Sequence, residues 1–143
     1  MQIITNNSEE TKKFAQQLAK KFIKIGGVIA LSGDLGTGKT TFTQGFAKGL
    51  GIKDKIISPT FVLTRQHRLP NFSRMLYHLD LYRLDDIASI KNIGIEEMIA
   101  DPLNIILIEW AEKARDLLPP ETIWIYFKSL DENTREITTL NLV

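Results

Sequence analysis

The glycine-rich stretch GDLGTGKTT, from Gly33 to Thr41, constrains the fold of this chain more than any other feature. It follows the pattern G-x-x-x-x-G-K-[ST], whose fixed positions are filled by Gly33, Gly38, Lys39 and Thr40. Glycines let consecutive backbone N–H groups point at phosphate oxygens, the lysine adds a cation, and the hydroxyl can coordinate Mg²⁺. The stretch predicts a phosphate-binding loop; the alternative is a glycine-rich turn that contains a lysine by chance.

The flanking residues favour the phosphate-binding loop. Val28 to Leu31, VIAL, is a short apolar run typical of a strand covered on both faces, and Thr40 to Leu50 has a helical pattern. Strand, glycine loop and helix in that order are the context that the motif requires, with the N–H groups of the helix start facing the phosphates. The residues that we expect to bind nucleotide are Gly36, Thr37, Gly38, Lys39, Thr40 and Thr41.

The rest of the chain predicts strands and helices around this unit. Residues 2–4 form a leading strand, and a helix capped by Asn7 or Ser8 follows. The later elements are an antiparallel pair (60–69 and 74–84), one or two short helices (85–101), an apolar strand (104–110), a short helix to Leu118 and a second hairpin (122–130 and 135–143). We expect one α/β domain over residues 1–143 with a single-domain P-loop NTPase fold: a mixed, mainly parallel sheet with antiparallel hairpins, flanked by helices.

Composition limits the possible environments and partners. Of the 143 residues 43% are hydrophobic, enough for one core, and 18 Lys and Arg against 17 Asp and Glu give a net charge of +1. That balance predicts neither a general nucleic-acid surface nor an acidic partner, so any binding should be local. Cysteine is absent, and the sequence has neither a secretory leader nor the ~18-residue apolar run of a membrane span, so we expect a cytoplasmic protein.

Two carboxylates are candidates for a metal or water site. Glu109 ends the apolar run NIILIEW, and ligands of open α/β sheets bind at that end of the strands, so Glu109 could hold Mg²⁺ together with Thr40. In YHLDLYRL, alternation places His78, Asp80 and Tyr82 on one face. Asp80 could orient an attacking water or hold a metal-bound water, and His78 could order it. An exposed strand end for Glu109 and a plain polar strand face for Asp80 are the alternatives.

Two further segments leave both interpretations open. The stretch Ser58–Phe61, SPTF, could present Thr60 to a γ phosphate, or it could be a rigid turn imposed by Pro59. Trp110 follows Glu109 and could pack near a nucleotide or in the core.

The choice of nucleotide and reaction depends partly on missing motifs. The chain lacks the [NT]-K-x-D segment with which many GTPases read guanine, which favours ATP. A small P-loop kinase would need an acceptor pocket and an arginine-bearing lid, and no segment has the length of a lid. The arginines that leave a kinase function possible are Arg65, Arg68, Arg74 and Arg83. The first three could equally shape a partner contact or be strand-edge charges. A nucleotide sensor without turnover is a third possibility, and a partner-dependent ATPase is the simplest interpretation.

In order along the chain, GDLGTGKTT, SPTF, HLDLYR, GIEE and LIEW resemble the TsaE (YjeE) family, bacterial ATPases of tRNA threonylcarbamoyladenosine biosynthesis. The resemblance extends from the first helix to the final hairpin. It implies an ATPase that is slow alone and acts with the TsaD and TsaB proteins, which install threonylcarbamoyl on the adenosine beside the anticodon. The implied contact with tRNA is indirect.

The resemblance also implies roles for single residues, with ATP and Mg²⁺ as cofactors. The loop backbone and its lysine would bind phosphates, and Thr40 would hold Mg²⁺ with the carboxylate of LIEW. Thr11 in the first helix and Arg135 in NTREI match positions near the adenine. The residues that the family motifs place in catalysis are Asp80, Lys39 and Glu109.

Overall fold

The computed structural model describes residues 1–34, 36–54, 56, 64–70 and 73–141. This part of the chain contains both strands and helices. In order they are β1 (Gln2–Thr5), α1 (Ser8–Ile25), β2 (Gly27–Ser32), α2 (Lys39–Gly49), β3 (Thr64–Arg68), β4 (Met75–Asp80), α3 (Ile87–Asn92), α4 (Ile95–Ala100), β5 (Ile105–Glu109), the 3-10 helix η1 (Ala111–Leu117), β6 (Ile123–Ser129) and β7 (Arg135–Leu140). The segment Ser58–Phe61, with Thr60, lies outside the described residues.

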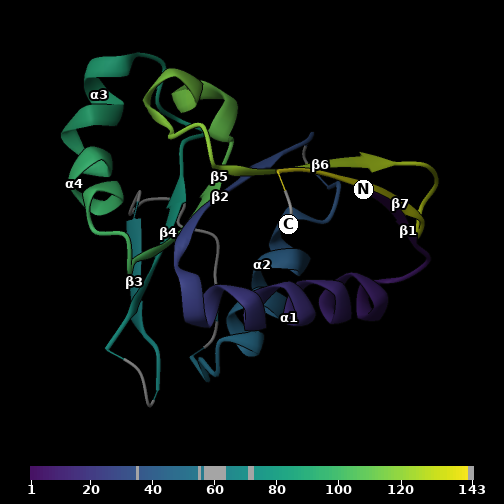
Figure 1. The fold of residues 1–143 in the computed structure, drawn as a ribbon. Helices are drawn as coiled ribbons and strands as arrows, with labels where there is room; N and C mark the ends of the chain where they lie inside the picture. The colour runs from purple at the N-terminus through teal and green to yellow at the C-terminus, as the bar shows by residue number, and fades with distance from the viewer. Residues whose placement is uncertain (35, 55, 57–63, 71–72, 142–143) are drawn as a thin grey trace.

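The described strands form one mixed sheet in the order β1-β7-β6-β2-β5-β4-β3 (Figure 1). The central strands β6, β2, β5 and β4 are parallel, and the outer pairs β1–β7, β7–β6 and β4–β3 are antiparallel. Both predicted hairpins and the parallel centre are therefore confirmed. The phosphate-loop strand β2 lies in the middle of the sheet, where both of its neighbours are parallel to it.

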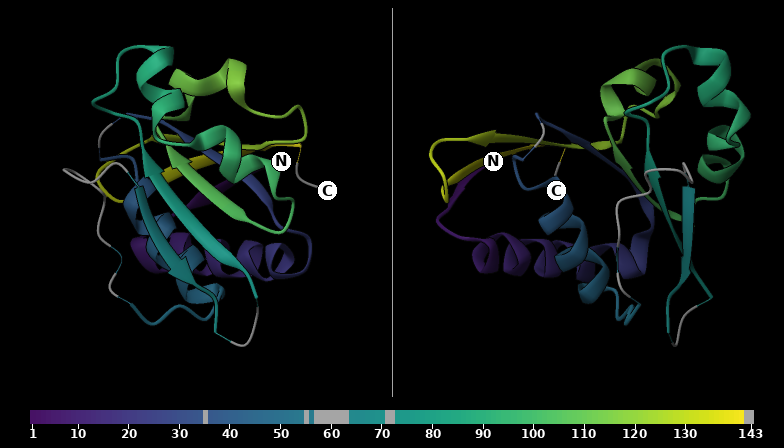
Figure 2. Two further views of the ribbon diagram at one scale, coloured as in Figure 1. Left: turned by 90° about the vertical axis from the view of Figure 1, so that its left-hand side faces the viewer. Right: turned by 180° about the vertical axis from the view of Figure 1, so that it is seen from behind.

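Helices cover the two faces of the sheet (Figures 1 and 2). α1 and α2 pack on one face, over a core that includes Phe22, Phe42 and Phe46, while α3, α4 and η1 pack on the other. β2 explains why a central strand is apolar throughout: Ile29 and Leu31 belong to the first core, and Val28 and Ala30 to the second.

α1 and α2 approach closely because glycines lie at their contact. A Cβ atom on Gly45 would lie 2.6 Å from the carbonyl oxygen of Lys12, and one on Gly49 would lie 2.7 Å from the carbonyl oxygen of Gln16. Both neighbours are backbone atoms, which cannot move without shifting the helix. The contact therefore fixes α2, which begins at Lys39, against α1.

The N-terminal cap of α1 forms as predicted. The side chain of Asn7 accepts a hydrogen bond from the backbone N–H of Glu10 at 2.9 Å, and the Glu10 carboxylate accepts one from the N–H of Asn6 at 3.0 Å. This start of α1 forms part of the pocket described below.

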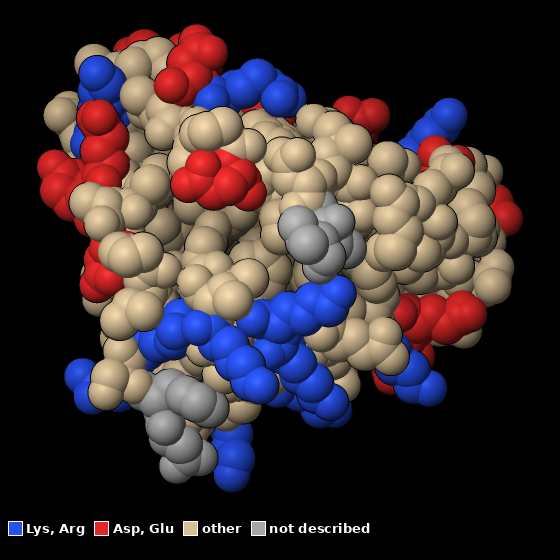
Figure 3. All heavy atoms as spheres, in the orientation of Figure 1, with Lys and Arg blue, Asp and Glu red and all other residues tan. Residues whose placement is uncertain are grey.

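Charge is unevenly spread despite the small net charge. In Figure 3, Lys and Arg side chains gather below the centre of the view, over α1. Exposed lysines recur along that helix at Lys13, Lys20, Lys21 and Lys24. A local basic surface thus exists on a chain that is nearly neutral overall. None of the helices in the described part of the chain combines the length and the apolar character needed to cross a membrane.

Candidate functional site

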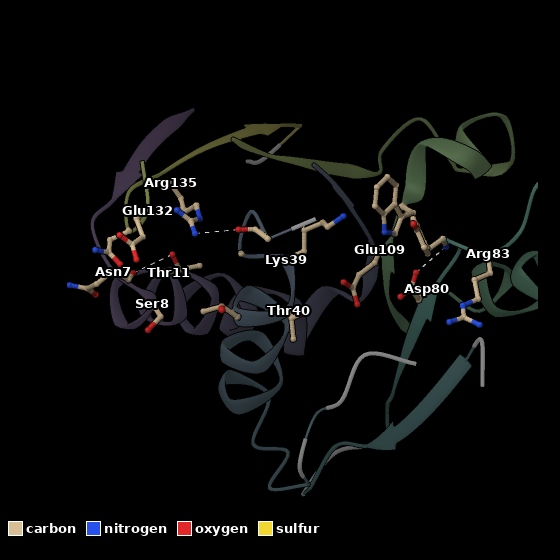
Figure 4. A pocket seen from close by; sticks show the side chains of 16 residues that line it. Asn7, Ser8, Thr11, Lys39, Thr40, Asp80, Arg83, Glu109, Glu132 and Arg135 are labelled. Atoms are coloured by element: carbon tan, nitrogen blue, oxygen red, sulfur yellow. Dashed lines mark hydrogen bonds between the residues drawn. The ribbon is translucent and has the colours of Figure 1, made fainter. Parts of the chain in front are cut away.

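A pocket of about 610 Å³ opens where β2, β4 and β5 end. Its walls come from distant segments of the chain: the start of α1, the glycine loop with α2, the ends of β4 and β5, and the β6–β7 hairpin (Figure 4). Thr11 and Arg135 lie at one end of the pocket, Lys39 and Thr40 in the middle, and Glu109 with Asp80 at the other end. The pocket is thus elongated, with the glycine loop at its centre.

The glycine loop has a backbone that other residues would not adopt readily. The φ angles are 152° at Gly33, 79° at Gly36 and 101° at Gly38. A Cβ on Gly33 would also lie 2.8 Å from the carbonyl oxygen of Phe127, so β6 leaves no room for a side chain there. No atom lies within 4 Å of a Cβ built on Gly36, among the described residues, so the loop is open on the pocket side.

Five of the six predicted nucleotide-binding loop residues line the pocket: Gly36, Gly38, Lys39, Thr40 and Thr41. Thr37 does not. Its side chain is 5% exposed, and its hydroxyl donates a hydrogen bond to the carbonyl oxygen of Asp34 at 2.6 Å. Thr37 therefore stabilises the turn of the loop from outside the pocket.

Lys39 is the first residue of α2 and is only 5% exposed. Its ammonium group donates a hydrogen bond to the carbonyl oxygen of Gly33 at 2.5 Å and lies 3.8 Å from the centroid of the Trp110 ring. Burial lowers the pKa of Lys39, and the carboxylates around it, of which Glu109 acts most strongly, oppose that shift. A phosphate chain in the loop would add further negative charge beside this ammonium group and oppose the lowering of its pKa.

Glu109 and Asp80 lie side by side at the ends of neighbouring parallel strands. The two residues are directly paired in the β4–β5 register, so their side chains point to the same face, where α2 begins. Glu109 is 4% exposed, which excludes the simple exposed strand end. The structure therefore brings both predicted carboxylates to the end of the pocket beyond Lys39.

The structure pairs His78 with Glu109. Nε2 of His78 lies 2.7 Å from Oε2 of Glu109, and His78 is 1% exposed. Alternation along β4 predicts that His78 acts with Asp80, because the two residues share a strand face. Sharing a face is correct, but the neighbouring strand β5 brings Glu109 closer to the imidazole, and that neighbour could not be read from alternation within one strand.

Asp80 is partly buried and accepts a hydrogen bond from the backbone N–H of Tyr82 at 3.0 Å. Burial raises the pKa of Asp80 above its ordinary value, and the nearby carboxylate of Glu109 adds to the effect. β4 ends at Asp80, so the predicted alternation does not continue through Tyr82, which lies in the following turn.

The far end of the pocket joins α1 to the β6–β7 hairpin. Thr11 is 2% exposed, and its hydroxyl lies 2.7 Å from the hydroxyl of Thr5. Arg135 donates a hydrogen bond to the carbonyl oxygen of Gly36 at 3.2 Å, which ties the hairpin to the glycine loop. Residues that the sequence analysis did not select also line this end: Asn7, Ser8, Glu132 and Asn133.

Within the described ranges, no group of three or more His, Cys, Asp or Glu residues is placed to hold a metal by itself. Mg²⁺ that accompanies a nucleotide takes one or two protein ligands and completes its shell with phosphate oxygens and waters. Thr40, Glu109 and Asp80 bring a hydroxyl and two carboxylates to one pocket beside the glycine loop. Their donor set fits a Mg²⁺ ion of that kind.

Trp110 lines the pocket, and the sequence left its placement open. It has a left-handed backbone, with φ of 57° and ψ of 40°, directly after the buried strand β5. This turn brings the indole over Lys39 and against Tyr82, whose ring centroid lies 5.0 Å away. A non-glycine residue with positive φ carries strain and is often found at functional sites. No sequence pattern signals that angle.

The fold and the pocket define a class of protein: a single-domain α/β protein with the P-loop NTPase fold. The family model for "Threonylcarbamoyl adenosine biosynthesis protein TsaE" matches residues 5–137, and the chain belongs to this family.

Individual relatives agree with that assignment. The chain is 42% identical over 137 residues to the "tRNA threonylcarbamoyladenosine biosynthesis protein TsaE" of Bacillus subtilis (strain 168), a match that covers 94% of this chain and 81% of the relative. It is 44% identical over 134 residues to the protein of the same name from Rickettsia felis, covering 93% and 75%. The solved structure "Crystal structure of Bacillus subtilus YdiB" superposes with a TM-score of 0.76 at 38% identity, covering 97% of this chain and 83% of that one.

Proposed function

We propose that this protein binds ATP with Mg²⁺ in the pocket and hydrolyses it as part of the machinery that makes threonylcarbamoyladenosine in tRNA. The observation that carries the proposal is the elongated pocket, in which a glycine loop with a buried lysine separates a polar, roomy end from an end with two carboxylates. A nucleoside triphosphate has the same order of parts: base and sugar, phosphates, and a reacting γ phosphate.

Each side chain has a role that follows from its place. The loop backbone, Lys39 and the start of α2 bind the phosphates, while Thr11 and Arg135 lie where the base and sugar would be. Mg²⁺, held by Thr40 and Glu109, would neutralise charge on the phosphate oxygens. Asp80 lies beyond Lys39, where the γ phosphate would be attacked.

Hydrolysis requires a water to attack the γ phosphorus while the bond to the bridging oxygen of ADP breaks. Asp80 orients this water and accepts its proton, and its raised pKa suits a proton acceptor better than an ordinary aspartate would. Lys39 balances the charge that shifts onto the leaving phosphate oxygens. The products are ADP and inorganic phosphate.

The biological role rests on the family. The relatives named above are threonylcarbamoyladenosine biosynthesis proteins, and we propose that this chain acts with TsaD and TsaB in the cytoplasm. In that role it contacts tRNA indirectly and supports the partners that carry out the modification.

The test is phosphate release from ATP and Mg²⁺, measured with the protein alone and with TsaD and TsaB added. We expect slow release that rises when the partners are present and is lost in Glu109→Ala and Asp80→Ala. A rate of phosphate release that is the same with and without TsaD and TsaB would refute the partner-dependent role.

The same assay separates the two other candidate activities. A small P-loop kinase would transfer labelled phosphate to a metabolite and release little free phosphate. A nucleotide sensor would bind ATP tightly and release none, even beside the partners. A kinase of this kind would need a lid, and among the described elements none beside the pocket has the length of one, which favours the ATPase.

A further inference from the structure

The buried contact between His78 and Glu109 has no place in the activity described so far. Glu109 is 4% exposed, and a buried carboxylate is costly unless hydrogen bonds satisfy it. The hydrogen bond of 2.7 Å from Nε2 of His78 meets that requirement. We infer that His78 is a positioning residue that fixes the Glu109 carboxylate in the orientation needed to hold Mg²⁺ with ATP.

The imidazole of His78 has one hydrogen-bond partner among the described residues, the carboxylate of Glu109. It is 1% exposed, and its Nδ1 is buried without a hydrogen-bond partner among the described residues. An unpaired buried nitrogen destabilises the fold compared with an apolar side chain of similar shape. A purely structural position on β4 would be filled better by an aliphatic residue, so the contact with Glu109 is what the ring provides.

The sheet register explains the direction of this support. On β4, His78 lies one pleat before Asp80, and Asp80 is paired directly with Glu109. His78 therefore approaches Glu109 from the interior of the sheet, with Leu76 beneath it, while Lys39 and the pocket lie on the other side. One carboxylate oxygen is held from behind, so the carboxylate cannot rotate freely in front of the glycine loop.

Partners that orient a metal ligand commonly change metal affinity by about 10–100-fold when they are removed. This inference rests on the proposed function, because it concerns the metal of that pocket. It adds a residue that neither the glycine-loop motif nor the two carboxylates identify. The nucleotide contacts in the middle and far end of the pocket should not depend on it.

Two substitutions isolate the hydrogen bond. His78→Gln keeps an N–H close to the position of Nε2, and His78→Asn keeps one only near Nδ1, out of reach of Glu109. Tyr77→Phe is the matched control, since Tyr77 precedes His78 on β4 and packs against the core on the other sheet face. Thermal unfolding of each variant is followed by circular dichroism; if His78→Asn does not fold, His78→Leu replaces it.

The measurement is binding of a non-hydrolysable ATP analogue by calorimetry as Mg²⁺ is varied, with EDTA as the metal-free reference. We expect His78→Asn to need about 10–100-fold more Mg²⁺ for half-maximal enhancement of binding. Its metal-free binding should match that of the unaltered protein, while His78→Gln and Tyr77→Phe should keep the normal Mg²⁺ requirement.

Three results would contradict these proposals: two would refute the positioning role of His78, and one would refute the proposed function. An unchanged Mg²⁺ requirement in His78→Asn would remove the positioning role, and so would equal defects in His78→Gln and His78→Asn, which would indicate ring packing alone. Failure of the unaltered protein to bind the analogue at all would instead refute the proposed function.

Discussion

The ammonium group of Lys39 lies 3.8 Å from the centre of the Trp110 ring while it donates a hydrogen bond to the carbonyl oxygen of Gly33. The cation that should meet phosphate is thus held by two groups of the protein itself. A phosphate bound by Lys39 would compete with the Gly33 carbonyl oxygen and the indole for the ammonium group. The left-handed backbone of Trp110 directs the ring toward this amine.

Trp110 should therefore report nucleotide binding. In a Trp124→Phe protein, which leaves Trp110 as the single tryptophan, we expect the emission spectrum to change saturably as ATP is added. The physical reason is the loss of the nearby positive charge from the face of the ring. A Lys39→Met change in the same background should abolish the response, and a response that persists there would contradict the proposed link.

Asp80→Asn should make the protein more stable while it slows hydrolysis by about 10²–10⁴-fold. Burial raises the pKa of Asp80 above 3.8, so the folded state binds more protons than the unfolded state between 3.8 and the raised pKa. Stability therefore falls as the pH rises through that window, and the full loss is present at neutral pH. Asparagine carries no charge, so the Asp80→Asn protein does not lose this stability as the pH rises.

The check is thermal unfolding of both proteins between pH 4 and pH 7. The advantage of Asp80→Asn should be greatest near neutral pH and should shrink toward pH 4. Asp86→Ala is a control of opposite sign, because Asp86 caps α3 through a hydrogen bond from Ser89, and its pKa is lowered by that bond. An Asp80→Asn protein that is less stable at pH 7 would refute the prediction.

Arg135→Ala should weaken ATP binding about 10-fold, or ~1.4 kcal/mol, with little effect on kcat. Arg135 contacts the carbonyl oxygens of Gly36, Asp131 and Thr134, far from the carboxylate end of the pocket. Steady-state kinetics separates KM from kcat, and Lys128→Ala on the exposed side of β6 serves as the control. A drop in kcat at unchanged KM would show that the hairpin acts on the chemical step.

Gly45→Ala should lower the free energy of unfolding by about 1–3 kcal/mol, even though alanine favours helices by about 1 kcal/mol. The added methyl would lie 2.6 Å from a backbone oxygen of α1, so the two helices must separate. Gln44→Ala, on the exposed side of α2, should stay within about 0.5 kcal/mol of the unaltered protein in urea unfolding. Equal stability of the two variants would argue against the close helix contact.

Local patterns in the sequence predict much of this fold. The apolar run at Val28, the capping pair Asn7 and Glu10, and the hairpin around residues 131–134 each depend on neighbours within a few residues. The order of the strands does not, because β1 pairs with β7 and β2 lies between β5 and β6, across most of the chain. Such pairings depend on contacts that no window of the sequence contains.

The same distinction holds for the site. The glycine-loop motif selects Lys39 and Thr40, and the strand-end rule selects Glu109. All three line the pocket, as does Asp80, which was selected from alternation along its strand. The partner of His78 and the backbone angle of Trp110 depend on how β4 and β5 lie together. The motif does not give the direction of each side chain, so the hydrogen bond from the Thr37 hydroxyl to the carbonyl oxygen of Asp34 could not be predicted from it.

The pairing of β1 with β7 has a consequence for synthesis of the protein. The glycine loop leaves the ribosome early, but Arg135, which holds it from the far end of the pocket, is in the last described strand, and that strand also pairs with β1. A growing chain thus carries a phosphate-binding motif long before the wall beside it exists. Nucleotide binding at full affinity should therefore begin only when the last strand has joined the sheet.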